Sequence, residues 1–170
     1  MKKSLSNLMK LVSLTVALAF IAPVMINAQT GKVNFAGNWT LNTAKSTMPQ
    51  GGGGRGGGRM GGGATFTVAQ DANSLTQTRT GQDGTARSTK YTLDGKETVN
   101  SFGQGESKST AKWSADGKSL TIVTKMSFNG NERTTTAVWS MPDARTLSIV
   151  STRPGRDGGE TKTTMVYDKK

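Results

Sequence analysis

Hydrophobic and polar side chains alternate along most of the chain, in short segments that are separated by turn signals. The first clear segment, 35–41 (FAGNWTL), has large or apolar positions on one face and small polar ones on the other. Such alternation is typical of a half-buried β-strand. The predicted inner face of this strand carries Phe35, Gly37, Trp39 and Leu41.

Turn signals divide the rest of the chain into segments of similar length. Asn-Gly and Asp-Gly pairs, as at 94–95, 116–117 and 129–130, supply the positive φ angles of tight hairpins, so consecutive strands should be antiparallel neighbours. A meander of this kind leaves two unpaired edges unless its sheet closes. We therefore predict an all-β, up-and-down barrel of eight to ten strands, counted as 35–42, 64–70, 73–80, 85–93, 96–101, 106–114, 118–128, 131–140, 145–152 and 160–168.

The alternation also predicts which side chains point into the barrel. The most regular segment, 118–128, places Leu120, Ile122, Thr124, Met126 and Phe128 on one face. The same parity predicts that Phe66, Val68, Leu75, Gln77, Tyr91, Leu93, Ala111, Trp113, Leu147, Ile149, Met165 and Tyr167 point inward. The opposite face is rich in Thr, Ser and Lys, which argues against a barrel embedded in an outer membrane.

The first 28 residues have the organisation of a secretory signal peptide. Basic residues precede an apolar run, 11–26, and small residues end the segment at Ala28. The run is shorter than the roughly 20 residues that span a bilayer, which argues against a membrane span. The chain contains no cysteine, so the mature chain has no lipidated cysteine and no disulfide. We expect one soluble domain, 29–170, exported to the periplasm or the extracellular space.

A glycine tract follows the first strand. Within 51–63 only Arg55, Arg59 and Met60 interrupt glycine, and such a segment gives up much backbone entropy when it is ordered. We predict a flexible loop at 43–63. Arg-Gly-Gly runs also occur in RNA-binding tails, but two arginines in an exported chain are weak evidence for that function. Without its leader the chain has 19 basic and 11 acidic residues, and they are scattered, which argues against nucleic acid as a partner.

The sequence lacks the residues that most enzymes of this size use. It has no histidine and no cysteine, which removes the usual ligands of zinc, copper and haem and the common nucleophile pairs. Its acidic residues lie almost entirely in or beside predicted turns. We therefore expect no cofactor, no metal and no enzymatic activity.

Three stretches carry a resemblance to a known superfamily: FAGNWTLNTAKS with its Gly-x-Trp, the central TLDGKETVN and WSADGKSLTIVTKM, and the final GETKTTMVYDKK. Together they resemble the calycin barrels, especially the lipocalins and the ten-stranded fatty-acid-binding proteins, and also small exported bacterial proteins described as lipocalin-like. This resemblance implies a barrel that binds a small hydrophobic or amphipathic ligand. The glycine tract stands where fatty-acid-binding proteins have a pair of helices. Met165 stands where their last strand has the arginine of an Arg-x-Tyr pair, whereas Tyr167 is kept.

The resemblance and the parity together define candidate site residues. Arg79 shares the parity of Leu75 and Gln77 and could substitute for the absent arginine, although a solvated arginine at a strand end is the alternative. The candidate ligand-lining residues are Arg79, Tyr91, Trp113, Met126, Met165 and Tyr167, and the candidate structural base is Phe35, Gly37 and Trp39. We expect a lipocalin-like protein, favoured as a monomer, that binds a small, partly hydrophobic ligand. The alternative is a structural or interaction module with a filled barrel and no ligand.

Overall fold

The computed structural model describes residues 31–47, 64–81, 83–102, 105–128, 131–155 and 158–170. Ten strands in this part of the chain form one sheet. The strands are β1 (Gly37–Leu41), β2 (Thr65–Gln70), β3 (Ser74–Thr80), β4 (Ala86–Thr92), β5 (Glu97–Phe102), β6 (Gly105–Trp113), β7 (Ser119–Phe128), β8 (Asn131–Asp143), β9 (Thr146–Pro154) and β10 (Glu160–Lys169).

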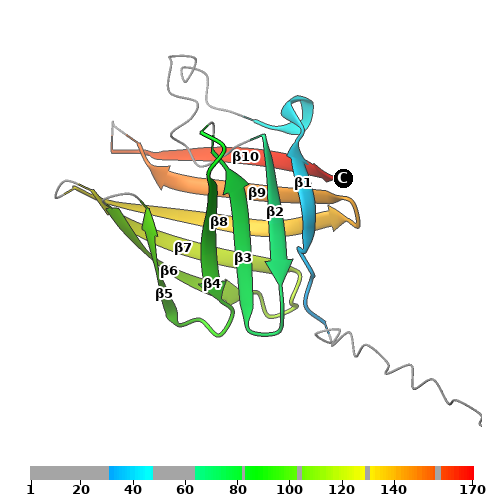
Figure 1. Cartoon of the computed structure of the whole chain (residues 1–170), viewed down its shortest axis with the longest axis horizontal. Coiled ribbons are helices and arrows are strands. Elements are labelled where there is room, and N and C mark those ends of the chain that lie inside the picture. Colours follow the sequence, from blue (N-terminus) through cyan, green and yellow to red (C-terminus); the bar gives the residue numbers. More distant parts are fainter. Residues whose placement is uncertain (1–30, 48–63, 82, 103–104, 129–130, 156–157) are drawn as a thin grey trace, which may run out of the picture.

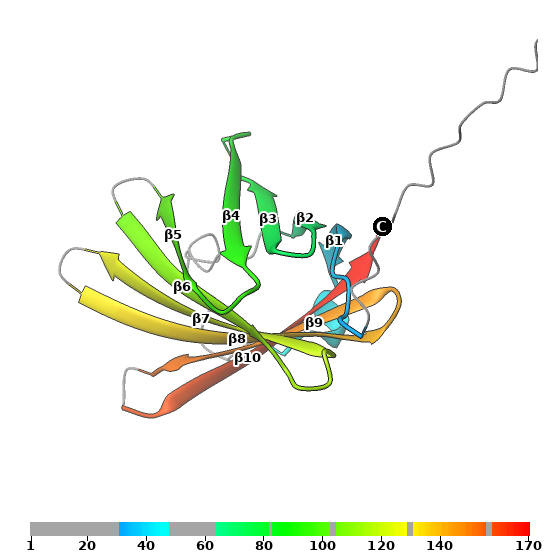
Figure 2. The same cartoon turned by 90° about the horizontal axis from the view of Figure 1, so that it is seen from below.

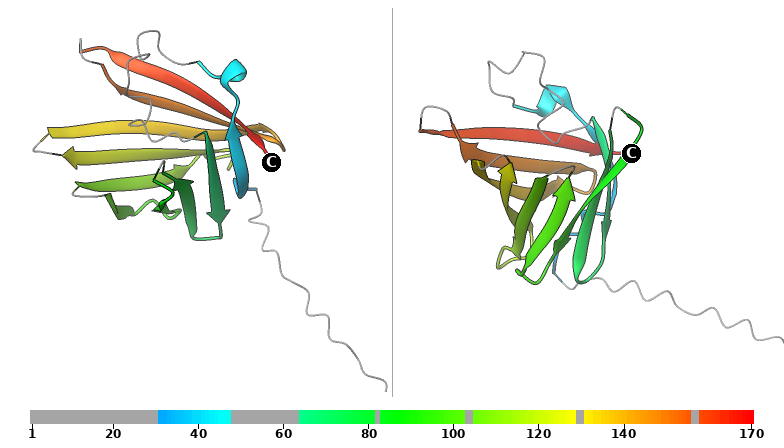
Figure 3. Two further views of the ribbon diagram at one scale, coloured as in Figure 1. Left: turned by 45° about the horizontal axis from the view of Figure 1, so that its top comes forward. Right: turned by 60° about the vertical axis from the view of Figure 1, so that its left-hand side comes forward.

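All neighbouring strands are antiparallel, in the order β4-β3-β2-β1-β10-β9-β8-β7-β6-β5. The first and last strands pair with each other, with Leu41 opposite Tyr167, so the meander curls into a nearly closed barrel. In Figure 1, β2, β3 and β4 run across the front, and β7 to β10 cross behind them. The free ends of the hairpins β7–β8 and β9–β10 project to the side, away from β1 to β3 (Figure 3, left). The ten-stranded meander predicted from the sequence is confirmed.

Predicted and observed strand ends agree within a few residues, with two informative differences. The first strand begins at Gly37 instead of residue 35, because residues 32–36 leave the sheet and cross one end of the barrel. Strand β8 continues to Asp143 through a register shift between Ser140 and Asp143. Such an irregularity lets a strand bend at a barrel rim.

The hydrophobic core fills the end of the barrel that holds the β2–β3, β4–β5, β6–β7 and β8–β9 turns, which we call the base. Aromatic rings dominate it: Phe35 stacks on Trp113 at 5.7 Å and meets Trp139 edge-on at 5.8 Å. Burial of each such side chain contributes about 1.5–3 kcal/mol. The buried apolar residues are Phe35, Trp39, Phe66, Val68, Leu75, Leu93, Ala111, Leu120, Ile122, Trp139, Leu147, Ile149 and Tyr167.

The Gly-x-Trp of the first strand has a steric cause. Gly37 has a φ of 148°, and a Cβ there would come within 2.6 Å of the Lys169 Cε. The Lys169 ammonium lies 5.5 Å from the centre of the Trp39 ring, a cation–π arrangement. The Trp39 indole is fully buried and donates a 2.9 Å hydrogen bond to the Phe35 carbonyl. Glycine is therefore needed because of this φ, which residues with a side chain rarely adopt, whereas the flexible end of Lys169 could move away from a Cβ.

The segment 32–36 closes the base and is fixed by one side chain. The Gln70 amide accepts a bond from the Phe35 N–H at 2.9 Å and donates one to the Val33 carbonyl at 3.0 Å. The Val33 N–H also bonds the Gly117 carbonyl at 3.0 Å. These bonds hold the Phe35 ring in the core.

The sheet has one seam, between its edge strands β4 and β5, and side chains bridge it. The Asn100 amide bonds both backbone groups of Lys90, at 2.8 and 2.9 Å, as a neighbouring strand would. The Thr92 N–H donates to the Thr98 hydroxyl at 3.0 Å. The two strands meet near their shared turn and diverge away from it (Figure 2). Closure is thus made by side chains along part of the seam.

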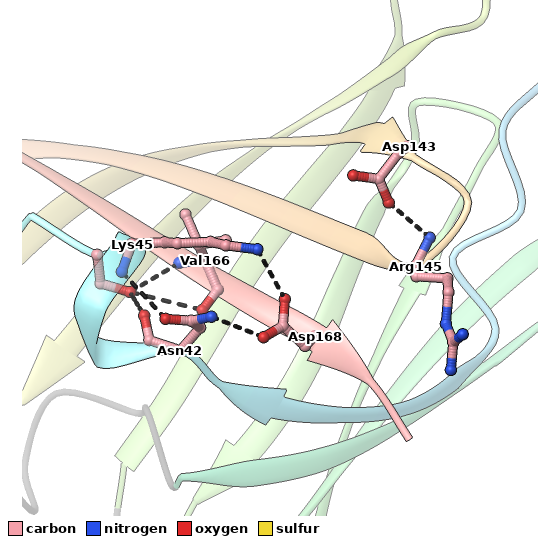
Figure 4. A network of polar contacts seen from close by, with 7 residues as sticks. Asn42, Lys45, Asp143, Arg145, Val166 and Asp168 are labelled. Carbon is pink, nitrogen blue, oxygen red and sulfur yellow. Dashed lines mark hydrogen bonds and ion pairs between the residues drawn. The ribbon is translucent and has the colours of Figure 1, made fainter.

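After β1 the chain is tied to β10 by a short 3₁₀ turn, Thr43–Lys45 (Figure 4). The Asn42 amide donates to Asp168 at 2.7 Å, and the Lys45 ammonium lies 3.5 Å from the same carboxylate. Thr47 then pairs with Thr164. The first residues of the expected 43–63 loop are therefore ordered, whereas 48–63 and the predicted signal peptide, 1–28, lie outside the described residues.

Candidate ligand site inside the barrel

The inner wall of the barrel changes character between its two ends. The end with the β3–β4, β7–β8 and β9–β10 turns, which we call the mouth, has polar groups where the base has rings and aliphatic chains. Four inward-facing polar side chains are buried there or just above the core: Gln77, Ser107, Ser109 and Thr163. The mixed interior that the sequence predicted is thus sorted along the barrel.

Arg79 lies where the two halves meet. It follows Leu75 and Gln77 on the inner face of β3, and its guanidinium carbon is 4.4 Å from the centre of the Phe66 ring. Its guanidinium also lies near the Tyr167 hydroxyl. Burial lowers the pKa of Arg79, and the contact with Tyr167 partly opposes that shift. Of the two alternatives for Arg79, a solvated arginine at a strand end and an arginine that enters the barrel, the structure supports the second.

Tyr167 joins this arginine to the core. Its ring packs edge-on against Phe66 at 4.8 Å, and the side chain is 1% exposed. Its hydroxyl donates a 3.6 Å hydrogen bond to the Met165 sulfur. Tyr91, opposite Leu75 on β4, is half-buried, and burial raises its pKa while the nearby Arg79 lowers it. Arg79, Tyr91, Met165 and Tyr167 therefore form one group, which we call the arginine–tyrosine cluster.

Gln77 lies next to this cluster and has an unsatisfied donor. Its side chain is 8% exposed, and its amide nitrogen has no hydrogen-bond partner among the described residues. A buried polar group without a partner costs about 1–3 kcal/mol. The parity predicts that Gln77 points inward, but no pattern in the sequence indicates that its amide is unsatisfied.

Two of the predicted lining residues lie away from the cluster. Met126 faces inward by register but is 37% exposed, and it pairs with Arg133 toward the mouth. Trp113 stacks on Phe35 at the base, where the Lys32 ammonium is 5.7 Å from its ring. Phe35, Gly37 and Trp39, the candidate structural residues, lie at the base. The Phe128 side chain is outside the described part of the structure.

Charged residues are distributed unequally between the two faces of the sheet. Arg87, Arg133 and Arg153 have the same inward parity as Arg79, each near a turn at the mouth. The acidic strand residues Glu97, Glu106, Glu132, Glu160 and Asp168 take outward positions. The inner wall at the mouth is therefore basic.

Two surface hollows lie outside this cluster. One, of about 460 Å³, is lined at the base by Lys32, Leu93, Asp94, Gly95, Lys112 and Trp113. The other, of about 270 Å³, lies over β1 to β3 and is lined mainly by threonines. Across the described ranges, no three histidine, cysteine or acidic side chains come together in a way that could hold a metal ion. No helix found in these ranges could cross a bilayer.

Comparison with known proteins gives the fold but not a family. The chain matches no family model and no curated protein sequence. Among solved structures, a secretary abundant heat soluble (SAHS) protein from Ramazzottius varieornatus is 9% identical with a TM-score of 0.54 and covers 80% of this chain and 95% of its own. Zebrafish ileal bile acid-binding protein is 17% identical with a TM-score of 0.53 and covers 80% and 98%. The fold is calycin-like.

A variant of the fluorescent protein UnaG is also similar, at 20% identity and a TM-score of 0.50, covering 80% of this chain and 96% of that protein. These calycin-like barrels match the described chain over most of their length. The resemblance seen in the short sequence motifs is therefore confirmed at the level of the fold.

Proposed function

We propose that this chain is an exported binding protein that takes a small, partly hydrophobic ligand into the mouth of the barrel, with an anionic group of the ligand at Arg79. One observation carries the proposal: an arginine enters the barrel and lies against an aromatic ring, beside two tyrosines. A guanidinium with hydroxyl neighbours recognises carboxylate or phosphate oxygens well.

Two further facts support the proposal. The apolar base below Arg79 and the basic wall above it give the interior an amphipathic gradient, which suits an amphipathic ligand. In addition, the zebrafish ileal bile acid-binding protein, which has a similar fold, was solved in a complex with cholic acid.

A binding panel tests the proposal. Fatty acids, bile acids and aromatic carboxylates are titrated while intrinsic tryptophan fluorescence and the melting temperature are followed. We expect at least one acid to bind the wild-type chain and to bind Arg79→Gln at least about tenfold more weakly, since a charge-assisted contact is worth more than 1.4 kcal/mol. Arg145→Gln, an exposed turn residue near the base, is the matched control. A panel without any response contradicts ligand binding.

Export is tested separately. Intact-mass measurement of the protein recovered from a cell fractionation should give a chain that begins at Gln29, found outside the cytoplasm. A full-length chain in the cytoplasm would contradict this part of the proposal.

A second candidate function is a filled structural or interaction barrel. It is favoured by the packing of the base, where Phe35, Trp39, Leu75, Leu120 and Leu147 are each 0% exposed. It predicts no response in the panel and an unchanged or higher stability for Arg79→Met, because a buried charge is replaced by an apolar chain of similar length.

A further inference from the structure

The inner face of the β3–β4 hairpin brings three hydrogen-bond donors together. In the register of this hairpin Gln77 lies opposite Thr89, and Arg79 lies directly opposite Arg87. Facing residues of an antiparallel pair have Cβ atoms roughly 4.5–5.5 Å apart, and neighbours along one face follow at roughly 7 Å. Gln77, Arg79 and Arg87, which we call the donor triad, therefore start from neighbouring points of one wall.

A pair of arginines at directly opposed positions is unfavourable by itself, because like charges repel across a strand pair. Arg87 is 69% exposed and forms a 2.9 Å ion pair with Asp83 in the β3–β4 turn. That carboxylate lies at the exposed side of the pair, whereas Arg79 lies deeper, over Phe66. An anion between the two guanidinium groups would relieve the repulsion.

Gln77 gives an independent indication of a ligand. Its amide nitrogen is buried on the same wall and has no partner within the described ranges, so it is a donor in place for an acceptor that these residues do not supply. The arginines attract an anion, and the amide adds a directed donor below them. A carboxylate would have two oxygens to share among these three donors, whereas a phosphate monoester has three terminal oxygens.

We propose that the anionic group bound in this barrel is a phosphate monoester, held between Arg79 and Arg87 with the Gln77 amide as a third donor. The inference rests on the proposed function, because it names the chemical class of the ligand head at the same site.

The test compares three probes with the same tail: dodecyl phosphate and dodecanoate below their critical micelle concentrations, and dodecanol below its solubility limit. Binding is measured at pH 8, where the phosphate is a dianion. We expect the wild-type chain to bind dodecyl phosphate at least about tenfold more tightly than dodecanoate, and dodecanol most weakly. Inorganic phosphate, as a fourth probe, should bind much more weakly than dodecyl phosphate.

Three variants test whether the donor triad causes the preference for phosphate over carboxylate. Arg87→Gln should weaken dodecyl phosphate about tenfold and dodecanoate by less than about threefold, whereas Arg79→Gln should weaken both. Gln77→Leu should reduce the preference for phosphate over carboxylate. Arg145→Gln is again the control, and a circular dichroism spectrum of each variant checks its fold.

The outcomes separate this inference from the proposed function. Equal affinity for dodecyl phosphate and dodecanoate, with the same loss for both in Arg87→Gln, overturns the phosphate assignment but leaves an anion-binding barrel. Inorganic phosphate that binds as tightly as dodecyl phosphate overturns the assignment of an amphipathic ligand. If none of the four probes binds, the phosphate assignment is overturned, and a silent acid panel would overturn the proposed function with it.

Discussion

The base and the mouth of this barrel are formed by the same strands, but their inward side chains differ in kind. At the base the inward positions carry rings and aliphatic chains that pack against one another, and the indole of Trp39 has its own hydrogen-bond acceptor. At the mouth the same alternation brings in arginines and hydroxyls. Among the described residues, each end has a buried donor without a partner, the Gln77 amide toward the mouth and the Trp113 indole N–H at the base.

Strand alternation determines which side chains point into the barrel. Their position along the barrel axis determines whether they pack in the core or line the mouth. A substitution at the base should therefore change stability, and a substitution at the mouth should change binding at little or no cost in stability. Three measurements test this division, and a fourth examines the surface turns, which belong to neither interior.

The largest effect is expected at the base. Trp39→Ala removes a fully buried indole and leaves a cavity, so it should lower the free energy of unfolding by about 3–5 kcal/mol. Urea denaturation followed by circular dichroism measures the change. Val99→Ala, at an outward position that is 52% exposed, should change it by less than about 0.5 kcal/mol. A loss below about 1 kcal/mol for Trp39→Ala would contradict its role in the core.

The next effect concerns the closing segment. Gln70→Ala removes both bonds that hold Val33 and Phe35, leaving two partly buried backbone groups without this partner. The expected loss is about 1–3 kcal/mol by the same denaturation experiment. Thr67→Ala, on the outer face of the same strand, is the control. Equal stability of the two variants would show that the packing of Phe35 alone fixes the segment.

At the mouth the sign should reverse. Gln77→Leu replaces an amide with an unsatisfied donor by an apolar side chain of similar size, so we expect the free energy of unfolding to rise by about 1 kcal/mol. Calorimetry should show this as an increase in melting temperature. Thr76→Leu, the outward neighbour, should give a change within about 0.5 kcal/mol. A destabilised Gln77→Leu would mean that the amide has a structural role.

The smallest effect is on pH dependence and involves neither end's interior. Backbone N–H groups lower the pKa of the turn residues Asp71, Asp94 and Asp143 below 3.8. Since the folded pKa is lower than the unfolded one, this stabilisation is present above about pH 4 and is lost as the pH falls through the folded pKa values. Urea midpoints between pH 7 and pH 2.5 should fall with acidity.

A variant checks the cause of that dependence. Asp71→Asn keeps an acceptor for the Asn73 and Ser74 N–H groups but carries no charge, so its urea midpoint should fall less steeply with acidity. Glu97→Gln, an exposed strand residue, is the control. The same slope in Asp71→Asn and in the wild type would exclude Asp71 from the effect.

The sequence predicted the strands well because each depends on local signals. Period-two alternation and Asp-Gly turns place the strand ends within a few residues, and Trp39 and Tyr167 lie in the core as parity requires. Parity does not show how far along the barrel axis, between base and mouth, an inward side chain lies. Trp113 was therefore grouped with the ligand wall, although it stacks on Phe35 at the base.

Other features depend on register between strands and could not be predicted. The opposition of Arg79 and Arg87 follows from the length of the β3–β4 turn, and a shift of one residue would place them on opposite faces. The crossing of residues 32–36 depends on Gln70, which is far away in the sequence. Arg79 itself could be proposed from its parity, but its contact with Phe66 required the structure.

At the seam between β4 and β5 the barrel wall is closed by side-chain hydrogen bonds in place of a strand ladder, so side-chain rotation can change the separation of these two strands. Because the Asn100 amide replaces a strand at Lys90, rotation of one side chain would release both backbone bonds without breaking any strand ladder. The Lys90 amide hydrogen should then exchange with solvent faster than those at the centre of β8, which have ladders on both sides. We therefore expect local opening of the barrel at the β4–β5 seam, while the packing of the aromatic base is unchanged.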